Sequence, residues 1–237
     1  MENVLVAGAN GTTGKIVVEL LNESQYFSPI AMVRKEEQQK QFQEKGIKTI
    51  LGDLEEDLAH AVKDVDKVIF AAGSGGHTGP DKTIDVDQEG AKNLIDESKK
   101  ANVKKFVMLS AINADNPESS DSLKHYLEAK RNADNFLKNS GLNYTIVRPG
   151  ALTNETGTRK IEAALDVERG AGGQLGGEMP SDSERKGLDL SADATIVFDD
   201  QLDVSTVEAE LNLMLNTKAK QDLFRGQYRD QVTFIIA

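Results

Sequence analysis

The 237-residue sequence contains no cysteine, no tryptophan, only five prolines and only 5% aromatic residues. The lack of cysteine excludes disulfides, thiolate zinc sites and a cysteine nucleophile, and it is compatible with a reducing compartment. No apolar run is long enough to span a bilayer. Met1 and Glu2 lead directly into a strand-like run without the pattern of a secretory leader. We therefore expect a cytoplasmic protein that does not enter a membrane.

Basic residues are also scarce relative to acidic ones: 28 Lys and Arg stand against 39 Asp and Glu, a net charge of −11. A broad surface for nucleic acid or an anionic membrane needs clustered Lys and Arg, so we expect neither partner. A small anionic ligand is still compatible, because backbone N–H groups can bind it locally. His60, in a stretch expected to form a polar helix, His77 and His125 are scattered without carboxylates at ligand spacing, so we predict no metal site.

Short apolar runs alternate with stretches of helical periodicity in the first 150 residues. This alternation predicts an α/β fold with a Rossmann-like, doubly wound parallel sheet and helices on both faces. A Rossmann-like fold would have the strand order 3-2-1-4-5-6. The predicted strands are Val4 to Ala7, Ile30 to Val33, Thr49 to Leu51, Lys67 to Ala71, Lys105 to Leu109 and Tyr144 to Val147; the predicted helices contain Ile16 to Leu21, Ala91 to Ser98 and Leu127 to Leu137.

The motif GANGTTG lies between the first predicted strand and the first predicted helix. Glycines permit a sharp turn and a close backbone approach, and a helix N-terminus offers free N–H groups and a partial positive charge. The spacing is GxxGxxG rather than GxGxxG, and a glycine-rich turn without a ligand remains the alternative. We predict that this turn binds the pyrophosphate of a dinucleotide through Gly8, Asn10, Gly11, Thr12, Thr13 and Gly14.

The residues after the second predicted strand bear on which dinucleotide is bound. A carboxylate there would accept hydrogen bonds from the 2′-hydroxyl of NAD, whereas this chain has Arg34 and Lys35. Arginine can pair bidentately with a 2′-phosphate, so we predict NADP as the cofactor. The alternative is a solvated basic pair, which Glu36 and Glu37 could neutralise.

Several further motifs resemble the atypical short-chain dehydrogenase/reductase family, near its NmrA-like and flavin/biliverdin reductase groups. They are GANGTTG at 8–14, VR at 33–34, GDLEE at 52–56, AAGSGG at 71–76, VMLSA at 107–111, YLEAK at 126–130 and YTIVRPGALT at 144–153. The resemblance implies that Asp53 and Leu54 flank the adenine. It also implies that Ala71, Ala72 and Gly73 line the ribose side of the cofactor and that Pro149 and Gly150 border the nicotinamide.

The resemblance also identifies Ser110, Tyr126 and Lys130 as a catalytic set. Tyr126 and Lys130 are four residues apart and so share a helix face, while Ser110 ends the fifth predicted strand. In the family's mechanism Tyr126 gives a proton to the substrate oxygen as hydride arrives. Lys130 lowers the pKa of the phenol and binds the nicotinamide ribose, and Ser110 holds the carbonyl oxygen. By chance alone, tyrosine and lysine four apart also occur on many helices.

The resemblance covers residues 1–165, which we predict to be an NAD(P)-binding Rossmann-like core. Residues 166–237 form a predicted C-terminal extension, with a Gly-rich segment of loop composition, a helix at 203–216 and a final strand. We expect an NADP-dependent oxidoreductase that transfers hydride to a small carbonyl, quinone or flavin-like substrate, in a possible homodimer. The alternatives are a non-catalytic sensor of the NADPH/NADP ratio and a nucleotide-sugar epimerase.

Overall fold

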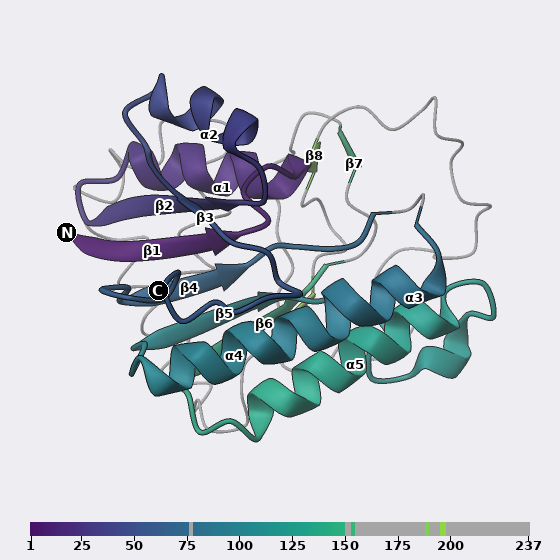
Figure 1. Cartoon of the computed structure of the whole chain (residues 1–237). Coiled ribbons are helices and arrows are strands. Elements are labelled where there is room, and N and C mark those ends of the chain that lie inside the picture. Colours follow the sequence, from purple (N-terminus) through teal and green to yellow (C-terminus); the bar gives the residue numbers. More distant parts are fainter. Residues whose placement is uncertain (76–77, 150–152, 155–187, 190–194, 198–237) are drawn as a thin grey trace, which may run out of the picture. The chain divides into compact units, whose positions relative to one another are not determined.

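The computed structural model describes residues 1–75, 78–149, 153–154, 188–189 and 195–197 (Figure 1). By its internal contacts the chain divides into two units, Met1–Ile146 and Val147–Ala237. The first unit alternates strands and helices in the order expected from the sequence. Its strands are β1 (Glu2–Ala7), β2 (Phe27–Val33), β3 (Lys48–Leu51), β4 (Lys67–Phe70) and β5 (Lys105–Leu109), and β6 (Tyr144–Arg148) follows across the boundary.

These strands form a parallel sheet in the order β3-β2-β1-β4-β5-β6, which confirms the predicted Rossmann-like topology. In the register, Ala7 of β1 pairs with Met32 of β2 and with Phe70 of β4. The carboxyl ends of the central strands therefore lie at one edge of the sheet. The order reverses at β1, where a doubly wound fold binds its ligands.

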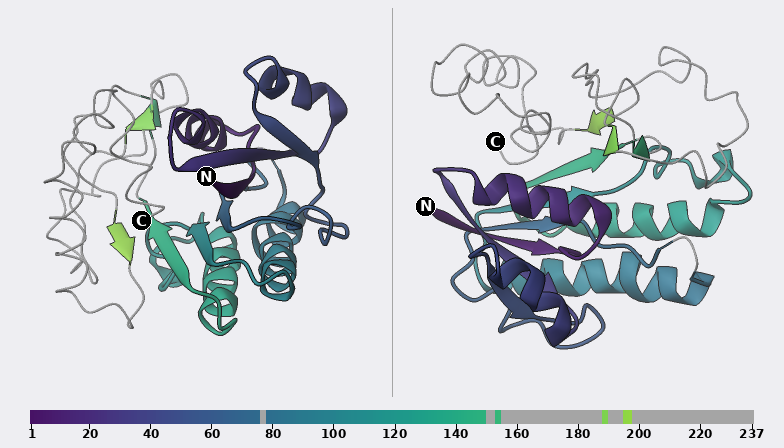
Figure 2. Two further views of the ribbon diagram at one scale, coloured as in Figure 1. Left: turned by 90° about the vertical axis from the view of Figure 1, so that its left-hand side faces the viewer. Right: turned by 90° about the horizontal axis from the view of Figure 1, so that it is seen from above.

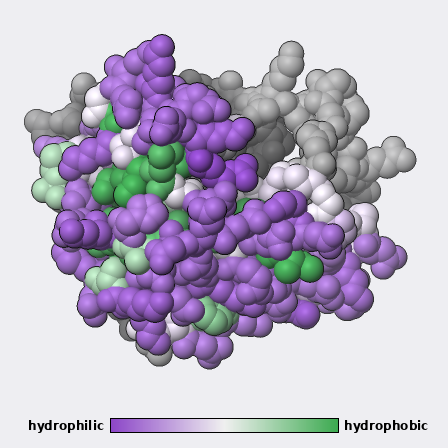
Figure 3. Space-filling view, viewed as in Figure 1, coloured by the Kyte–Doolittle hydropathy of each residue, from purple (hydrophilic) through white to green (hydrophobic). Residues whose placement is uncertain are grey.

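Helices cover both faces of the sheet, with α1 and α2 on one face and α4 and α5 on the other (Figure 2). Their bounds are α1 (Thr12–Asn22), α2 (Glu36–Gln43), α4 (Ala91–Lys100) and α5 (Lys124–Lys138). The strands are nearly continuous in apolar residues because both faces are buried. Leu5, Phe70 and Phe106 are fully buried in the core. On the face in Figure 3, hydrophilic side chains dominate and hydrophobic ones form small separate patches.

The helices differ from the prediction in three places, of which one is α2, a helix that was not predicted. The α4 helix is preceded without a break by α3 (Pro80–Lys82) and by a π-helical segment, η1 (Thr83–Gly90). The prediction of a polar helix around His60 was wrong, because residues 54–64 form turns instead. Carboxylates explain the turns: Asp53 Oδ1 accepts from Glu55 N at 3.1 Å, and Asp57 Oδ1 accepts from Ala59 N at 2.9 Å.

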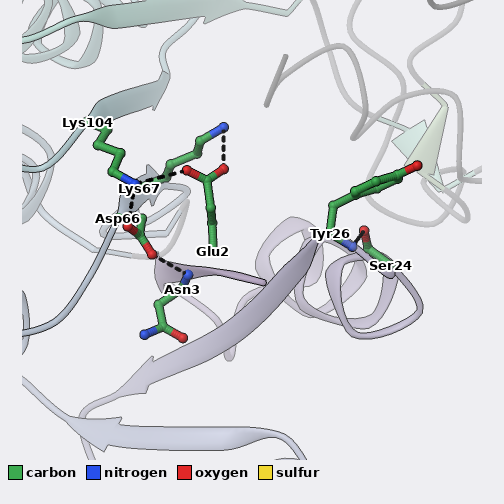
Figure 4. A network of polar contacts seen from close by, with 7 residues as sticks. All are labelled: Glu2, Asn3, Ser24, Tyr26, Asp66, Lys67 and Lys104. Carbon is green, nitrogen blue, oxygen red and sulfur yellow. Dashed lines mark hydrogen bonds and ion pairs between the residues drawn. The ribbon is translucent and has the colours of Figure 1, made fainter.

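The amino ends of the sheet strands are joined by a polar network at the edge opposite their carboxyl ends (Figure 4). Asp66 accepts a hydrogen bond from Asn3 N at 2.8 Å and pairs with Lys104 Nζ at 2.8 Å. Glu2 pairs with Lys67 at 3.2 Å and with Lys104 at 3.4 Å. The hydrogen bonds from Lys104 and from Asn3 N lower the pKa of Asp66 below its ordinary value.

The second unit is described only in short segments. After β6 these are β7 (Thr153–Asn154), β8 (Leu188–Asp189) and β9 (Thr195–Val197), and β7 pairs antiparallel with β8. The predicted helix at 203–216 and the final strand lie outside the described residues, as does most of the Gly-rich segment. The domain boundary at residue 165 stays a prediction. No helix in the described part is long and apolar enough to cross a membrane.

Candidate cofactor-binding and active site

The glycine turn after β1 is packed backbone against backbone. Gly8 has φ +82°, a conformation that side chains disfavour, and a Cβ on it would lie 2.6 Å from the Ala72 backbone. A Cβ on Gly14 would lie 2.1 Å from Gly8 O. Both positions therefore require glycine, and the turn is closed by Gly11 N donating to Gly8 O at 2.9 Å. The sequence places the sharp turn correctly, between β1 and α1.

The first turn of α1 carries N–H groups that the helix itself cannot satisfy. Gly11 is the N-cap, with no side-chain cap and no acidic residue in the first turn. The N–H groups of Thr12, Thr13 and Gly14 have no acceptor four residues earlier within the helix. Together with the partial positive charge of the helix end, they form a site suited to a phosphate group.

The carboxyl end of β2 presents Arg34 and Lys35, and both side chains are exposed. Their backbone N–H groups both donate to Gln38 Oε1, at 3.1 and 3.2 Å, which fixes the start of α2. A second α2 residue, Gln41, donates from Nε2 to Asn10 Oδ1 at 2.6 Å. Gln41 therefore links the glycine turn to α2, a contact that no motif in the sequence indicates.

The segments after β3 and β4 reach the same edge. Gly52 N donates to Val33 O at 3.0 Å, which brings Asp53 to the end of β2. Leu54 is buried in the core beside Gly90, where a Cβ would lie 2.7 Å from Leu54 Cβ. Its side chain therefore has a packing role, whether or not it also flanks an adenine.

The segment from Ala71 to Gly73 lies directly beside the glycine turn. Ala71 N donates to Ala7 O at 2.9 Å, and Ala72 makes the close approach to Gly8 described above. Gly73 is exposed, and Ala71 and Ala72 are half-buried. These three residues are placed where they could line a cofactor held at the α1 N-terminus.

The three predicted catalytic residues lie directly after β5 (Ser110) and on α5 (Tyr126 and Lys130), but two of them already have strong partners. Ser110 is buried, and its hydroxyl donates to Asp134 Oδ2 at 2.9 Å. Lys130 Nζ lies 3.0 Å from Asp87 Oδ1 and donates to Leu109 O at 3.3 Å. Tyr126 is half-buried, and its ring centroid is 5.7 Å from Lys130 Nζ. Tyr126 is thus the member of the set whose side chain is not fully buried.

Lys130 is a buried cation among acidic groups. Burial by itself would lower its pKa, but the charge of an ionised Tyr126 and the carboxylates of Asp87 and Asp134 outweigh burial. The pKa of Lys130 is therefore raised above its ordinary value. The ammonium stays charged at neutral pH, as the predicted mechanism requires, while its nearest partner is Asp87 rather than the phenol.

Asp87 and Asp134 are site residues that the sequence analysis missed. Both lie in helices outside the motifs, and both are almost completely buried, at 1% and 0% exposure. Pro149 directly follows β6, whereas Gly150 and His77 lie outside the described residues. The roles assigned to the individual site residues stay predictions. Within the described residues, no group of three acidic or histidine side chains is arranged to hold a metal.

Comparison with known proteins gives the same family for most of the chain. A family model described as NAD(P)H-binding matches residues 8–178. A Bacillus subtilis (strain 168) protein, named as an uncharacterized sugar epimerase, is 47% identical over 171 residues, which are 70% of this chain and 80% of that protein. Sanguinarine reductase of Eschscholzia californica is 30% identical over 208 residues, covering 69% of this chain and 74% of that protein.

A solved structure from Bacillus halodurans, assigned by name to the NAD-dependent epimerase/dehydratase class, is also similar. It shares 46% sequence identity and a TM-score of 0.65 with this chain, over 68% of this chain and 76% of that one. The solved structure shares the fold, and the names of these relatives span more than one reaction.

Proposed function

Because the chain belongs to the NAD(P)H-binding atypical short-chain dehydrogenase/reductase family, we propose that it is an NADP-dependent reductase. The reaction is a hydride transfer from NADPH to a small carbonyl, quinone or flavin-like acceptor. The similarity to a plant reductase supports a reduction. The choice of NADP is supported by Arg34 and Lys35, two exposed basic residues that directly follow β2 at the position where an NAD-binding chain would carry a carboxylate.

The observation that carries the proposal is the cradle formed by the glycine turn and the first turn of α1. A Cβ on Gly8 or Gly14 would clash with the backbone that shapes this turn, and the N–H groups of Thr12, Thr13 and Gly14 have no acceptor within the helix and would be free to bind a pyrophosphate. The donor set fits an anionic dinucleotide. Arg34 would pair with the 2′-phosphate and the 71–73 segment would line the ribose side.

The bound nicotinamide would supply the hydride, and the protein's own groups would position the acceptor and move a proton. Tyr126 would donate from its hydroxyl to an acceptor oxygen, as the predicted mechanism has it. The buried ammonium of Lys130 would favour the ionised phenol that is left behind. Ser110 could donate to the same oxygen only after its bond to Asp134 is broken.

Competitive titration with NADPH and NADH tests the cofactor. We expect wild-type protein to bind NADPH at least about tenfold more tightly, the scale of one charge-assisted contact. Arg34→Glu should remove this preference, and Lys99→Glu, the same charge change at an exposed position on α4, should retain it. Equal binding of NADH and NADPH by wild-type protein would contradict the assignment of NADP.

Turnover separates the reductase from two other functions. An epimerase is favoured by the name of the Bacillus subtilis relative, and it would interconvert a sugar nucleotide without net consumption of NADPH. A sensor would bind NADPH without turnover. A panel of quinones, flavins and aldehydes, assayed for NADPH oxidation and in parallel with nucleotide sugars, distinguishes the three. Stoichiometric NADPH oxidation with any acceptor supports the reductase.

A further inference from the structure

The segment that lines the predicted ribose side of the cofactor is held from two sides. On one side Gly8 contacts Ala72, so the segment and the phosphate turn share a backbone interface. On the other side lies the carboxylate of Asp87: Ser74 N donates to Asp87 Oδ2 at 2.9 Å, and a Cβ on Gly73 would be 3.2 Å from Asp87 Oδ1. The position of residues 71–74 therefore depends on this side chain.

Asp87 is delivered by the π-helical segment η1, which precedes α4. A π-helical turn is rare, and such turns are frequent at functional sites. Thr83, one turn earlier on η1, is also buried, and its Oγ1 lies 3.2 Å from Ser74 Oγ. The η1 helix thus makes two separate polar contacts with Ser74. The Asp87 carboxylate accepts from the Ser74 backbone N–H, and the Thr83 hydroxyl contacts the Ser74 hydroxyl.

Lys130 neutralises the buried carboxylate. Asp87 is 1% exposed, and an isolated buried carboxylate would be strongly unfavourable. The ammonium of Lys130 lies 3.0 Å from Asp87 Oδ1, which has no other polar partner among the described residues. Contacts therefore connect Lys130 on α5 to Asp87, and Asp87 to Ser74. The adjoining segment 71–73 in turn contacts Gly8.

We infer that Asp87 is a positioning residue for the cofactor: its carboxylate holds the segment 71–74 against the phosphate turn, and Lys130 pairs with that carboxylate in the interior. The inference rests on the proposed function, because it needs a dinucleotide at the α1 N-terminus. It gives Lys130 a second role besides the predicted catalytic one. It also explains why the buried ion pair of Asp87 and Lys130 lies beside the segment 71–73, which consists of alanine and glycine only.

Two double variants test the inference without the complication of an unpaired buried charge. Asp87→Asn with Lys130→Met removes both charges but keeps a side-chain oxygen that can accept from Ser74 N. Asp87→Leu with Lys130→Met also removes both charges. It removes the hydrogen-bond acceptor as well, because leucine resembles asparagine in shape but has no polar atom. The two share the change at Lys130, so any direct contact between Lys130 and the cofactor cancels in the comparison.

We expect the Leu variant to bind NADPH about fivefold to tenfold more weakly than the Asn variant, the scale of one lost hydrogen bond to an ordered backbone N–H. Faster hydrogen exchange of the Ser74 amide in the Leu variant should accompany the loss. Asp85→Asn, a change on the exposed side of η1, is the control and should bind NADPH as wild type does. If the Leu variant does not fold, Asp87→Ser with Lys130→Met replaces it, because a serine hydroxyl is too short to reach Ser74 N.

The outcomes separate this inference from the function on which it rests. Wild-type protein that binds neither NADPH nor NADH would refute the proposed function, and the inference with it. Wild-type protein that binds NADPH, with equal affinities in the Asn variant and the acceptor-less variant, would overturn the inference alone. Rescue of affinity by asparagine, with similar melting temperatures for the two double variants, supports it, because a merely structural role would change stability and leave the affinity ratio at one.

Discussion

Replacing Gly8 with alanine tests the packing of the phosphate turn. Gly8 has φ +82°, so a side chain there costs about 1–2 kcal/mol for the left-handed conformation alone. The new Cβ would also lie 2.6 Å from the Ala72 backbone, a contact that neither backbone can avoid without moving. Overpacking of this kind adds about 1–3 kcal/mol. We therefore expect Gly8→Ala to lower the free energy of unfolding by about 2–5 kcal/mol.

The structure supplies a matched control for this substitution. Gly46 has φ +72°, but a Cβ there would have no atom within 4 Å. Gly46→Ala should cost only the conformational part, about 1–2 kcal/mol. Urea unfolding measures both variants, and NADPH fluorescence measures their binding.

The two variants should differ in binding even more than in stability. A displaced turn loses its alignment with the pyrophosphate, so Gly8→Ala should weaken NADPH binding at least about tenfold, or 1.4 kcal/mol. Gly46→Ala should leave binding unchanged. If the two variants unfold at the same urea concentration and bind NADPH equally, the close approach of Gly8 to Ala72 does not shape the site.

Three further predictions follow from single contacts. Tyr126→Phe should lower kcat with a carbonyl acceptor by about 10²-fold or more while NADPH binding is retained; an unchanged kcat would rule out the phenol as proton donor. Asp66→Asn should lower the free energy of unfolding by about 1 kcal/mol near neutral pH. The folded state lowers the pKa of Asp66 from its ordinary 3.8, so this stabilisation is present above that value and is lost as the pH falls through the lower folded-state pKa. Urea unfolding of the two proteins should therefore converge in acid, and a constant difference would contradict the reasoning. Gly90→Ala should lower the free energy of unfolding by about 1–3 kcal/mol, although alanine favours helices, because its Cβ would lie 2.7 Å from Leu54 Cβ. A stabilised variant would show that η1 can move away from Leu54.

The sheet could be predicted from the sequence because its strands are buried on both faces. A short apolar run such as KFVML at β5 predicts a buried strand. The alternation of such strands with helices predicted a Rossmann-like fold, and with it the strand order. The α2 helix was not predicted because EEQQKQFQ has one buried residue, Phe42, and so no apolar periodicity. Polar capping contacts from Gln38 hold its start, and these are not visible in a hydrophobic pattern.

The candidate site was predictable where the backbone constrains the residue type. Gly8 and Gly14 are required by contacts that a Cβ would violate, so the motif carries the geometry with it. Asp87 was not predictable, because its role depends on a π-helical turn and on Lys130, which is 43 residues further along the chain. A carboxylate in a charged helix such as TIDVDQEG gives no sign of being buried.

The most direct test of the account is the melting temperature of wild-type protein with and without saturating NADPH. Binding to the folded state at 100 times Kd stabilises by about 2.7 kcal/mol. For a chain of this size that corresponds to a rise of about 5–10 °C. We predict this rise with NADPH and a clearly smaller one with NADH at the same concentration. No change with either dinucleotide would contradict the claim that the first turn of α1 binds a pyrophosphate.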